Sequence, residues 1–197
     1  MVRNLDHARQ PRPICVGVVL AGGRSLRMGR DKALLPYRGR PLIEHMIALL
    51  QSANLSNVVV SGDYPQYQGI PDEHYQRGPL AGIFALYRRY ADEQVLLIPV
   101  DMPNLTSACL NQLIAYDNRV NYVRYAQHIF PMRLRLDLTV LRHLHELLAT
   151  PIQDGLEKPS LHALLLRLSA LAIDDSALEN SIFQNINTPQ NWHELQQ

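Results

Sequence analysis

The sequence predicts an α/β fold whose mostly parallel sheet is covered by helices on both faces. Over residues 15–115, short apolar segments rich in valine, leucine and isoleucine alternate with segments whose apolar residues recur at helical spacing. Strands that are apolar on both faces are typical of a sheet buried between two layers. Since parallel strands are joined by crossovers, ligands of such a sheet collect at the carboxyl ends of its strands.

The first part of the chain supplies the parallel strands and the helices that connect them. Its helices begin at residues that favour a helix start, a proline in the first turn or a threonine as the N-cap. The expected elements are a strand at Cys15–Leu20, a helix over residues 41–52, a strand over 57–61, a short strand around Ile70, a helix at Pro79–Tyr90, a strand over 94–100, and a helix capped by Thr106.

The second part is less regular and predicts an inserted antiparallel hairpin from residues 122–127 and 129–136. Residues 137–149 and 160–168 are expected to form helices, residues 183–186 a last strand, and Thr188 the cap of a final helix. Residues 1–13 are expected to form a flexible arm, and residues 14–197 a single domain. The apolar run at 14–23 could pass for a signal peptide, but its glycines lead directly into a basic loop, so we favour the arm.

The composition argues against several classes of function. The chain has 19 basic and 18 acidic residues and a net charge of +1, so no broad positive field is present to hold a nucleic acid. No stretch is apolar over the length that a bilayer requires, so no membrane is expected. The two cysteines, Cys15 and Cys109, do not suggest a disulfide framework. We therefore expect a reduced, cytoplasmic protein that acts on a small ligand.

Residues 20–35, LAGGRSLRMGRDKALL, place two glycines and a basic cluster directly after the first strand. Glycines let a backbone approach a ligand, and basic side chains neutralise the charge of a phosphate chain. The spacing matches neither a Walker loop nor G-x-G-x-x-G, so phosphate binding competes with an ordinary solvated loop. Lys32 and Arg27 are better phosphate-binding candidates than Arg24 and Arg30.

This loop closely resembles that of the molybdenum cofactor guanylyltransferases, a family within the larger nucleotidyltransferase group. The resemblance continues in GPLAG at residues 78–82, PVDMP at 99–103 and NINTP at 185–189, and it covers the chain from about Val16 onward. It implies a three-layer α/β/α Rossmann-like nucleotidyltransferase fold. It also implies transfer of GMP from GTP to the terminal phosphate of molybdenum-bound molybdopterin, with release of pyrophosphate. Because that phosphate is already ionised, the reaction requires in-line placement and charge neutralisation rather than a side-chain nucleophile.

The resemblance also implies a set of site residues. Arg27 and Lys32 would neutralise the triphosphate, and Asp101 would be the ligand of Mg²⁺, although a turn cap is an alternative role for this aspartate. The other nucleotide contacts implied are Leu20, Ala21, Gly22, Gly23, Ser61, Asp72, Gly78, Pro79 and Leu80, and the implied substrate contacts are Gly82, Asn185 and Asn187.

Three points within this assignment stay open at the level of sequence. The guanine base offers two adjacent donors that one carboxylate can accept; Asp72 is the first candidate and Asp63 the second, and either could instead be a solvated turn residue. GPLAG could simply start a helix and let it pack closely. The chain also departs from the family in the hairpin, where Phe130 and Arg133 stand in a region expected to face the pterin substrate.

The partners implied are GTP and molybdenum-molybdopterin, with molybdenum-insertion proteins or apo-molybdoenzymes as protein partners. The chain is expected to act as a monomer. Two other functions remain possible from the sequence. One is a cytidylyl- or sugar-nucleotidyltransferase with the same loop, and the other is a non-catalytic carrier of nucleotide or molybdenum cofactor. Lys32 and Asp101 argue against the carrier, which has no use for a metal at a scissile phosphate.

Overall fold

A six-stranded sheet forms the middle layer of the computed structural model, with the strand order β4-β1-β5-β7-β6-β8. The structure describes residues 15–22, 31–72, 77–117, 119–150, 160–168, 170–188 and 190–192. β7 runs antiparallel to its neighbours β5 and β6, whereas β1 pairs in parallel with β4 and β5, and β6 with β8. The strands are β1 (Cys15–Leu20), β4 (Val58–Ser61), β5 (Gln94–Pro99), β6 (Tyr122–Tyr125), β7 (Met132–Arg135) and β8 (Ala170–Ile173).

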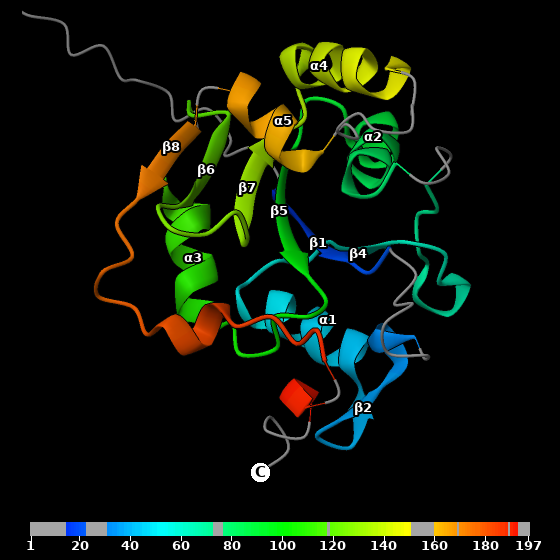
Figure 1. Cartoon of the computed structure of the whole chain (residues 1–197), viewed down its shortest axis with the longest axis vertical. Coiled ribbons are helices and arrows are strands. Elements are labelled where there is room, and N and C mark those ends of the chain that lie inside the picture. Colours follow the sequence, from blue (N-terminus) through cyan, green and yellow to red (C-terminus); the bar gives the residue numbers. More distant parts are fainter. Residues whose placement is uncertain are drawn as a thin grey trace, which may run out of the picture.

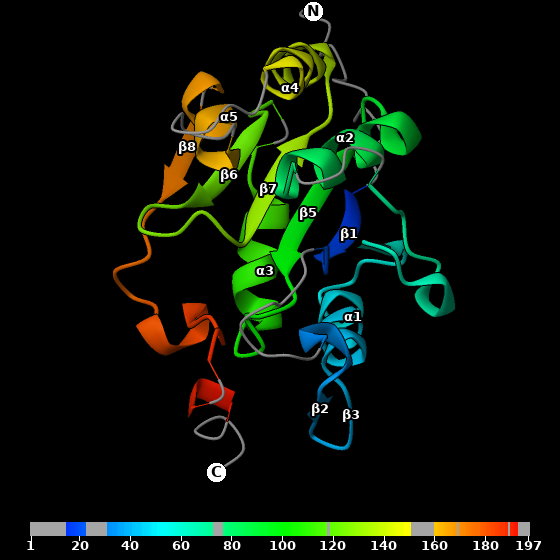
Figure 2. The same ribbon diagram turned by 45° about the vertical axis from the view of Figure 1, so that its right-hand side comes forward.

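Helices cover both faces of this sheet, as Figures 1 and 2 show. α1 and α3 lie on one face, and α2, α4 and α5 lie on the other. A short antiparallel pair, β2 with β3, leads into α1. The bounds are β2 (Pro36–Tyr37), β3 (Arg40–Pro41), α1 (Leu42–Ser52), α2 (Pro79–Tyr90), α3 (Ser107–Ala115), α4 (Leu138–Ala149) and α5 (Leu161–Arg167), with 3₁₀ turns η1 (Lys32–Leu34), η2 (Pro65–Tyr67) and η3 (Asn180–Phe183).

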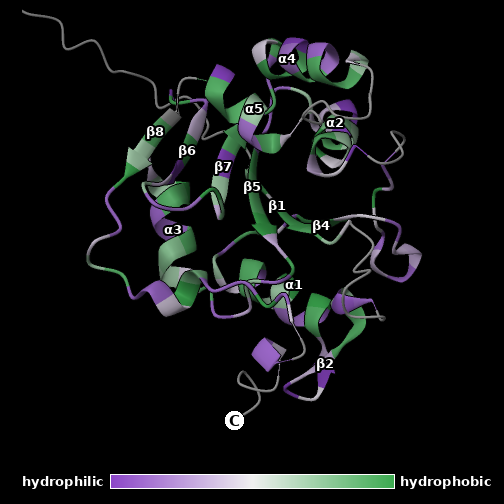
Figure 3. Ribbon diagram, viewed as in Figure 1, coloured by the Kyte–Doolittle hydropathy of each residue, from purple (hydrophilic) through white to green (hydrophobic). Residues whose placement is uncertain are grey.

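Two apolar cores separate the three layers. Successive strand residues point to opposite faces, so Val19 of β1 joins the core that contains Met46 of α1, while Val18 joins the core that contains Leu86 of α2. Figure 3 shows the hydrophobic colouring of β1 and β5 in the middle layer. The predicted α/β fold with a mostly parallel sheet and an inserted antiparallel hairpin is therefore confirmed.

The predicted last strand at residues 183–186 is wrong. Asn180–Phe183 forms the 3₁₀ turn η3, and the last strand of the sheet is β8, which pairs with β6. The alanines of β8 give a weak strand signal by themselves, and pairing with a buried neighbour supplies what local propensity lacks. The short strand expected around Ile70 is a single bridge to Ser61.

Helix starts follow the predicted chemistry. The Thr106 side chain accepts a hydrogen bond from the Cys109 N–H at 3.3 Å, which caps α3. Thr188 accepts from the Asn191 N–H at 3.1 Å and caps the helical turn at residues 190–192. The proposed arm at residues 1–13 lies outside the described residues, and the single-domain boundary at residue 14 stays a prediction. No helix in the described part of the chain is both long and apolar enough to span a bilayer.

Candidate nucleotide-binding cleft

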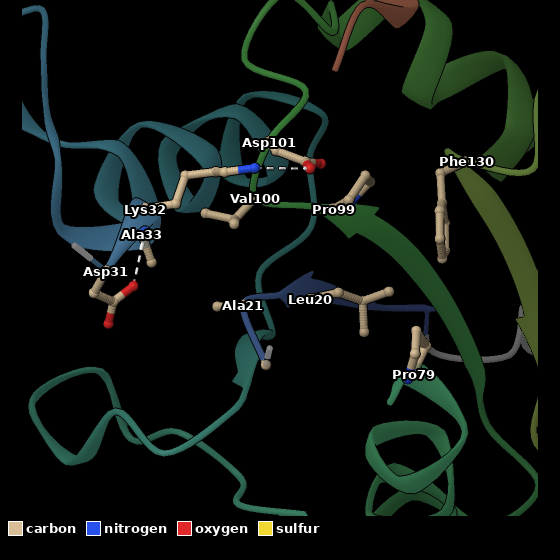
Figure 4. Close-up of a pocket in the computed structure, with 11 residues that line it drawn as sticks. Leu20, Ala21, Asp31, Lys32, Ala33, Pro79, Pro99, Val100, Asp101 and Phe130 are labelled. Carbon is tan, nitrogen blue, oxygen red and sulfur yellow. Dashed lines mark hydrogen bonds and ion pairs between the residues drawn. The ribbon is translucent and has the colours of Figure 1, made fainter. Parts of the chain in front are cut away.

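A cleft of about 270 Å³ opens where β1 and β5 end. Because these strands are parallel neighbours, their carboxyl ends deliver side chains to one edge of the sheet. Figure 4 shows Lys32 and Asp101 on one side, Phe130 and Pro79 on the other, and Leu20 between them. The described lining residues are Leu20, Ala21, Gly22, Asp31, Lys32, Ala33, Pro79, Pro99, Val100, Asp101 and Phe130.

The floor of the cleft is the end of β1, which is held against both neighbouring strands. The N–H groups of Ala21 and Gly22 both donate to the Ser61 carbonyl at 2.9 Å, and the Val100 N–H donates to the Leu20 carbonyl at 3.0 Å. These hydrogen bonds fix the backbone at the carboxyl end of β1. The Gly22 N–H is therefore engaged by β4, although the residue itself lines the cleft.

Lys32 extends from the first position of η1 toward Asp101, on the same side of the cleft (Figure 4). Asp31 caps this turn by accepting the Ala33 N–H at 3.0 Å, which sets the direction of the lysine that follows it. The Lys32 ammonium lies 3.3 Å from Asp101 Oδ2 and donates to Asn187 Oδ1 at 2.9 Å. Its side chain is only 10 % exposed, so two oxygen acceptors compensate a largely buried charge.

Asp101 is held by the segment that carries Asn187. The Ile186 N–H donates to the Asp101 carbonyl at 2.8 Å, which docks residues 185–187 against the end of β5. The Asp101 side chain keeps 23 % of its surface exposed to the cleft. Three residues that are far apart in the sequence, Lys32, Asp101 and Asn187, thus form one polar cluster at the edge of the sheet.

α2 begins at the opposite wall. Gly78 is the residue before the helix and has φ 57° and ψ −145°, a conformation that is open to glycine and strained for other residues. Pro79, the first residue of α2, lines the cleft, so the positive end of the helix dipole lies at the wall. Such an end favours a bound anion over a cation.

Comparison with known proteins shows the family of this chain. The family model described as the MobA-like NTP transferase domain matches residues 17–169. This chain belongs to that family. A molybdenum cofactor guanylyltransferase of Xanthomonas euvesicatoria pv. vesicatoria is 45 % identical over 180 residues, which cover 91 % of this chain and 93 % of the relative. Another of that name, from Photobacterium profundum, is 31 % identical over 191 residues, with 91 % and 93 % covered.

Solved structures support the MobA-like fold at lower identity. The molybdopterin-guanine dinucleotide biosynthesis protein A of Archaeoglobus fulgidus superposes with a TM-score of 0.71 at 20 % identity. The match covers 91 % of this chain and 96 % of that one. This likeness concerns the three-layer nucleotidyltransferase fold, whereas the family assignment rests on the sequence matches.

The structure brings together part of the predicted site of this MobA-like chain. Leu20, Ala21, Gly22, Lys32, Pro79 and Asp101 line the cleft, and Asn187 contacts Lys32. Gly23 and Arg27 lie outside the described residues. The residues placed elsewhere are Ser61 and Leu80, which are buried, Gly82, which is packed inside α2, and Asp72, Gly78 and Asn185, which are exposed and not among the described lining residues.

Gly82 of α2 packs closely against Ser61 at the end of β4. A Cβ atom on Gly82 would lie 2.6 Å from Ser61 Oγ, closer than real Cβ contacts come. The missing side chain therefore lets α2 approach the end of β4. This contact gives Gly82 a packing role, which is the alternative that the sequence left open for GPLAG.

The expectation that Arg133 faces the pterin substrate is corrected. Arg133 is 1 % exposed and points from β7 toward the end of α3. Its guanidinium donates to the carbonyls of Tyr116 at 2.9 Å and Asp117 at 2.8 Å, so it closes the helix end. Burial lowers the pKa of this arginine. In contrast, Phe130 from the same hairpin does line the cleft.

The described residues contain no cluster of three or more histidines, cysteines or acids that could hold a metal by themselves. Mg²⁺ does not require one, since it is commonly bound by one or two carboxylates together with water and substrate phosphates. Asp101, with its partly exposed carboxylate, fits that donor set.

Proposed function

We propose that this chain transfers GMP from GTP to the terminal phosphate of molybdenum-molybdopterin. An oxygen of the pterin phosphate forms a bond to the α-phosphorus of GTP, the bond from that phosphorus to the bridging oxygen breaks, and pyrophosphate leaves. The observation that carries the proposal is the Lys32, Asp101 and Asn187 cluster at the carboxyl ends of β1 and β5. The relatives named molybdenum cofactor guanylyltransferase supply the substrates.

The cleft suits a reaction that uses no protein nucleophile. Its described lining residues include no serine, cysteine or histidine. Burial raises the pKa of the Cys15 thiol to about 11 and also raises that of Cys109, so both thiols stay protonated near neutral pH. The attacking phosphate oxygen is ionised without help from a base. Catalysis then consists of holding the two phosphates in line and stabilising negative charge.

Lys32 is the group best placed to stabilise that charge. Its ammonium already lies in the cleft, held between the Asp101 carboxylate and the Asn187 amide oxygen. A triphosphate entering beside Pro79 and Gly22 would meet this ammonium and the start of α2 together. Asn187 then keeps the lysine in place while Asp101 is occupied with the metal.

Mg²⁺ is the cofactor that we propose for this site. Bound Mg²⁺ would supply positive charge between the α-phosphate and the incoming phosphate. Asp101 would be its protein ligand, because Mg²⁺ is commonly held by one or two carboxylates together with substrate phosphates and water. We also propose that an exposed acid outside the described lining of the cleft reads guanine. Asp72 is the first candidate and Asp63 the second; both are exposed.

The remaining parts of the proposal concern the setting of the reaction. We propose that the chain works as a cytoplasmic monomer of one domain over residues 14–197, preceded by an arm. The product would pass to molybdenum-insertion proteins or to apo-molybdoenzymes.

The test is pyrophosphate release with Mg²⁺, molybdenum-molybdopterin and each nucleoside triphosphate in turn. We expect release with GTP and only background release with ATP or CTP. Reactions without the molybdenum cofactor are the control for simple hydrolysis. Equal or faster release with CTP would assign the chain to cytidylyl transfer instead, and tight GTP binding without any release would make it a carrier.

A further inference from the structure

The Tyr64 hydroxyl lies between two described segments that line the cleft. It is 2.9 Å from each carboxylate oxygen of Asp31 and 3.3 Å from the Ala21 carbonyl oxygen. Both Asp31 and Ala21 line the cleft. A hydroxyl donates one proton, and the shorter distances and the negative charge favour Asp31 as the acceptor. Tyr64 thus connects the end of β1 with the start of η1.

Packing holds the Tyr64 ring in a fixed position. It is 8 % exposed and belongs to the core on the α1 side of the sheet. Gly62 lies between this ring and the end of β1: a Cβ there would be 3.0 Å from Tyr64 Cε2 and 3.1 Å from the Gly22 nitrogen. The Gly69 N–H donates to the Tyr64 carbonyl at 2.9 Å and closes the turn. The hydroxyl is therefore presented from a rigid base.

Asp31 transmits this position to Lys32. The oxygen Asp31 Oδ1 that faces Tyr64 also accepts the Ala33 N–H at 3.0 Å and caps η1. Lys32 is the first residue of that turn, and its side chain extends to Asp101. Without the tyrosine hydroxyl, the Asp31 carboxylate keeps its bond to the Ala33 N–H but loses its link to Tyr64, so the turn that carries the lysine is held less firmly.

We propose that Tyr64 is a positioning residue. It holds Asp31 and the η1 turn so that the Lys32 ammonium lies in the cleft where the triphosphate would bind. Burial and the neighbouring Asp31 raise the pKa of the Tyr64 hydroxyl, which therefore stays a donor throughout the neutral range. The catalytic part of this inference rests on the proposed function, whereas the placement of Lys32 can be tested without turnover.

The variant Tyr64→Phe keeps the ring and removes the hydroxyl alone. Tyr67→Phe is its matched control, because the Tyr67 hydroxyl also donates to a carboxylate, Glu44 Oε1 at 2.9 Å, but neither residue lines the cleft. With GTP and molybdenum cofactor, we expect Tyr64→Phe to raise KM for GTP and to lower kcat/KM about tenfold, the scale of a hydrogen bond to a charged group. Tyr67→Phe should match wild type. A mere loss of folded protein would lower kcat and leave KM unchanged.

Acylation of lysine gives a readout without turnover. The chain has two lysines, Lys32 and Lys158, so mass spectrometry after brief treatment with an amine-acylating reagent reports Lys32 with Lys158 as internal reference. We expect faster acylation of Lys32 in Tyr64→Phe than in wild type or Tyr67→Phe. This result would stand even if GTP turned out not to be the substrate.

A second variant, Asp31→Ala, keeps the test decisive if Tyr64→Phe is unstable, because it leaves Tyr64 in place and should by itself speed the acylation of Lys32. Asp31→Ala removes the other partner of the same bond, so Lys32 acylation in the double variant should equal that in Asp31→Ala alone. The inference is overturned if Tyr64→Phe leaves both KM and Lys32 acylation at wild-type values. It is equally overturned if the Asp31→Ala and Tyr64→Phe effects on acylation simply add.

Discussion

Replacing Gly82 by alanine should destabilise the protein through one contact. The new Cβ would lie 2.6 Å from Ser61 Oγ, so this buried hydroxyl would have to leave its present rotamer or α2 would have to move away from β4. Overpacking of this kind costs about 1–3 kcal/mol. The higher helix propensity of alanine offsets this cost by up to about 1 kcal/mol. We therefore expect Gly82→Ala to lower the free energy of unfolding by up to about 2 kcal/mol.

Removing the opposing oxygen should reverse this loss. In Ser61→Ala the clashing atom is gone, and the nearest remaining atom of that side chain is its Cβ, 3.9 Å from the new methyl group, an ordinary contact distance. The double variant then keeps the helix propensity of alanine without the clash. Its free energy of unfolding should return to at least the wild-type value, which makes the two substitutions strongly non-additive.

Urea unfolding followed by circular dichroism measures this directly, with the midpoint shifting and the slope unchanged. The packing explanation is refuted if Gly82→Ala is as stable as wild type, or if Ser61→Ala fails to restore it. KM for GTP separates packing from binding. A stable double variant with a raised KM would show that Ser61 or Gly82 contacts the nucleotide, as the sequence resemblance implies.

Four further substitutions test the site. Asp101→Asn should still bind GTP but lose about a hundredfold or more in kcat, with a higher Mg²⁺ requirement in the pyrophosphate assay, because the metal loses its anionic ligand; near-normal turnover would remove Asp101 from the mechanism. Lys32→Ala should raise KM and lower kcat together, by about a hundredfold in kcat/KM, and no change in either would make it a structural residue. Asp72→Ala should reduce the preference for GTP over ATP and CTP by about 1–3 kcal/mol, while loss of preference in Asp63→Ala alone would move the assignment to that acid. Arg133→Met should lower the free energy of unfolding by about 1–3 kcal/mol, because the carbonyls at the end of α3 lose their donors, and should leave KM for GTP unchanged; a raised KM would return this residue to the cleft.

The sequence predicted most of the fold because the buried strands carry strong signals. β1, β4 and β5 are short valine- and leucine-rich runs whose partners are other runs of the same kind. β8 was missed because its residues, ALAI, have little strand preference, and only pairing with β6 makes them a strand. Long-range pairing of this kind is a property of the sheet rather than of the segment.

The candidate site was predictable where the residue type is rare and its position is fixed by a strand end. Asp101 could be nominated because it follows a buried strand, and Lys32 because its loop resembles that of the family. The Asn187 bond to Lys32, in contrast, depends on how the segment after β8 returns to the sheet. Tyr64 gave no signal, since a tyrosine after Gly62 and Asp63 is an ordinary turn residue. Its role follows from the distance between its hydroxyl and Asp31.

The hydrogen bond from Lys32 to Asn187 joins residues 155 positions apart in the chain. It can therefore form only after nearly the whole chain has been synthesised. The ribosome releases the segment that contains β1, β5 and Asp101 long before it releases Ile186 and Asn187. Asn187 binds the Lys32 ammonium, and the Ile186 N–H binds the Asp101 carbonyl. A nascent or truncated chain that stops before residue 186 can pair Lys32 only with Asp101 among these partners. The Lys32, Asp101 and Asn187 cluster is thus completed last during synthesis, and unfinished chains lack the arrangement to which we ascribe catalysis.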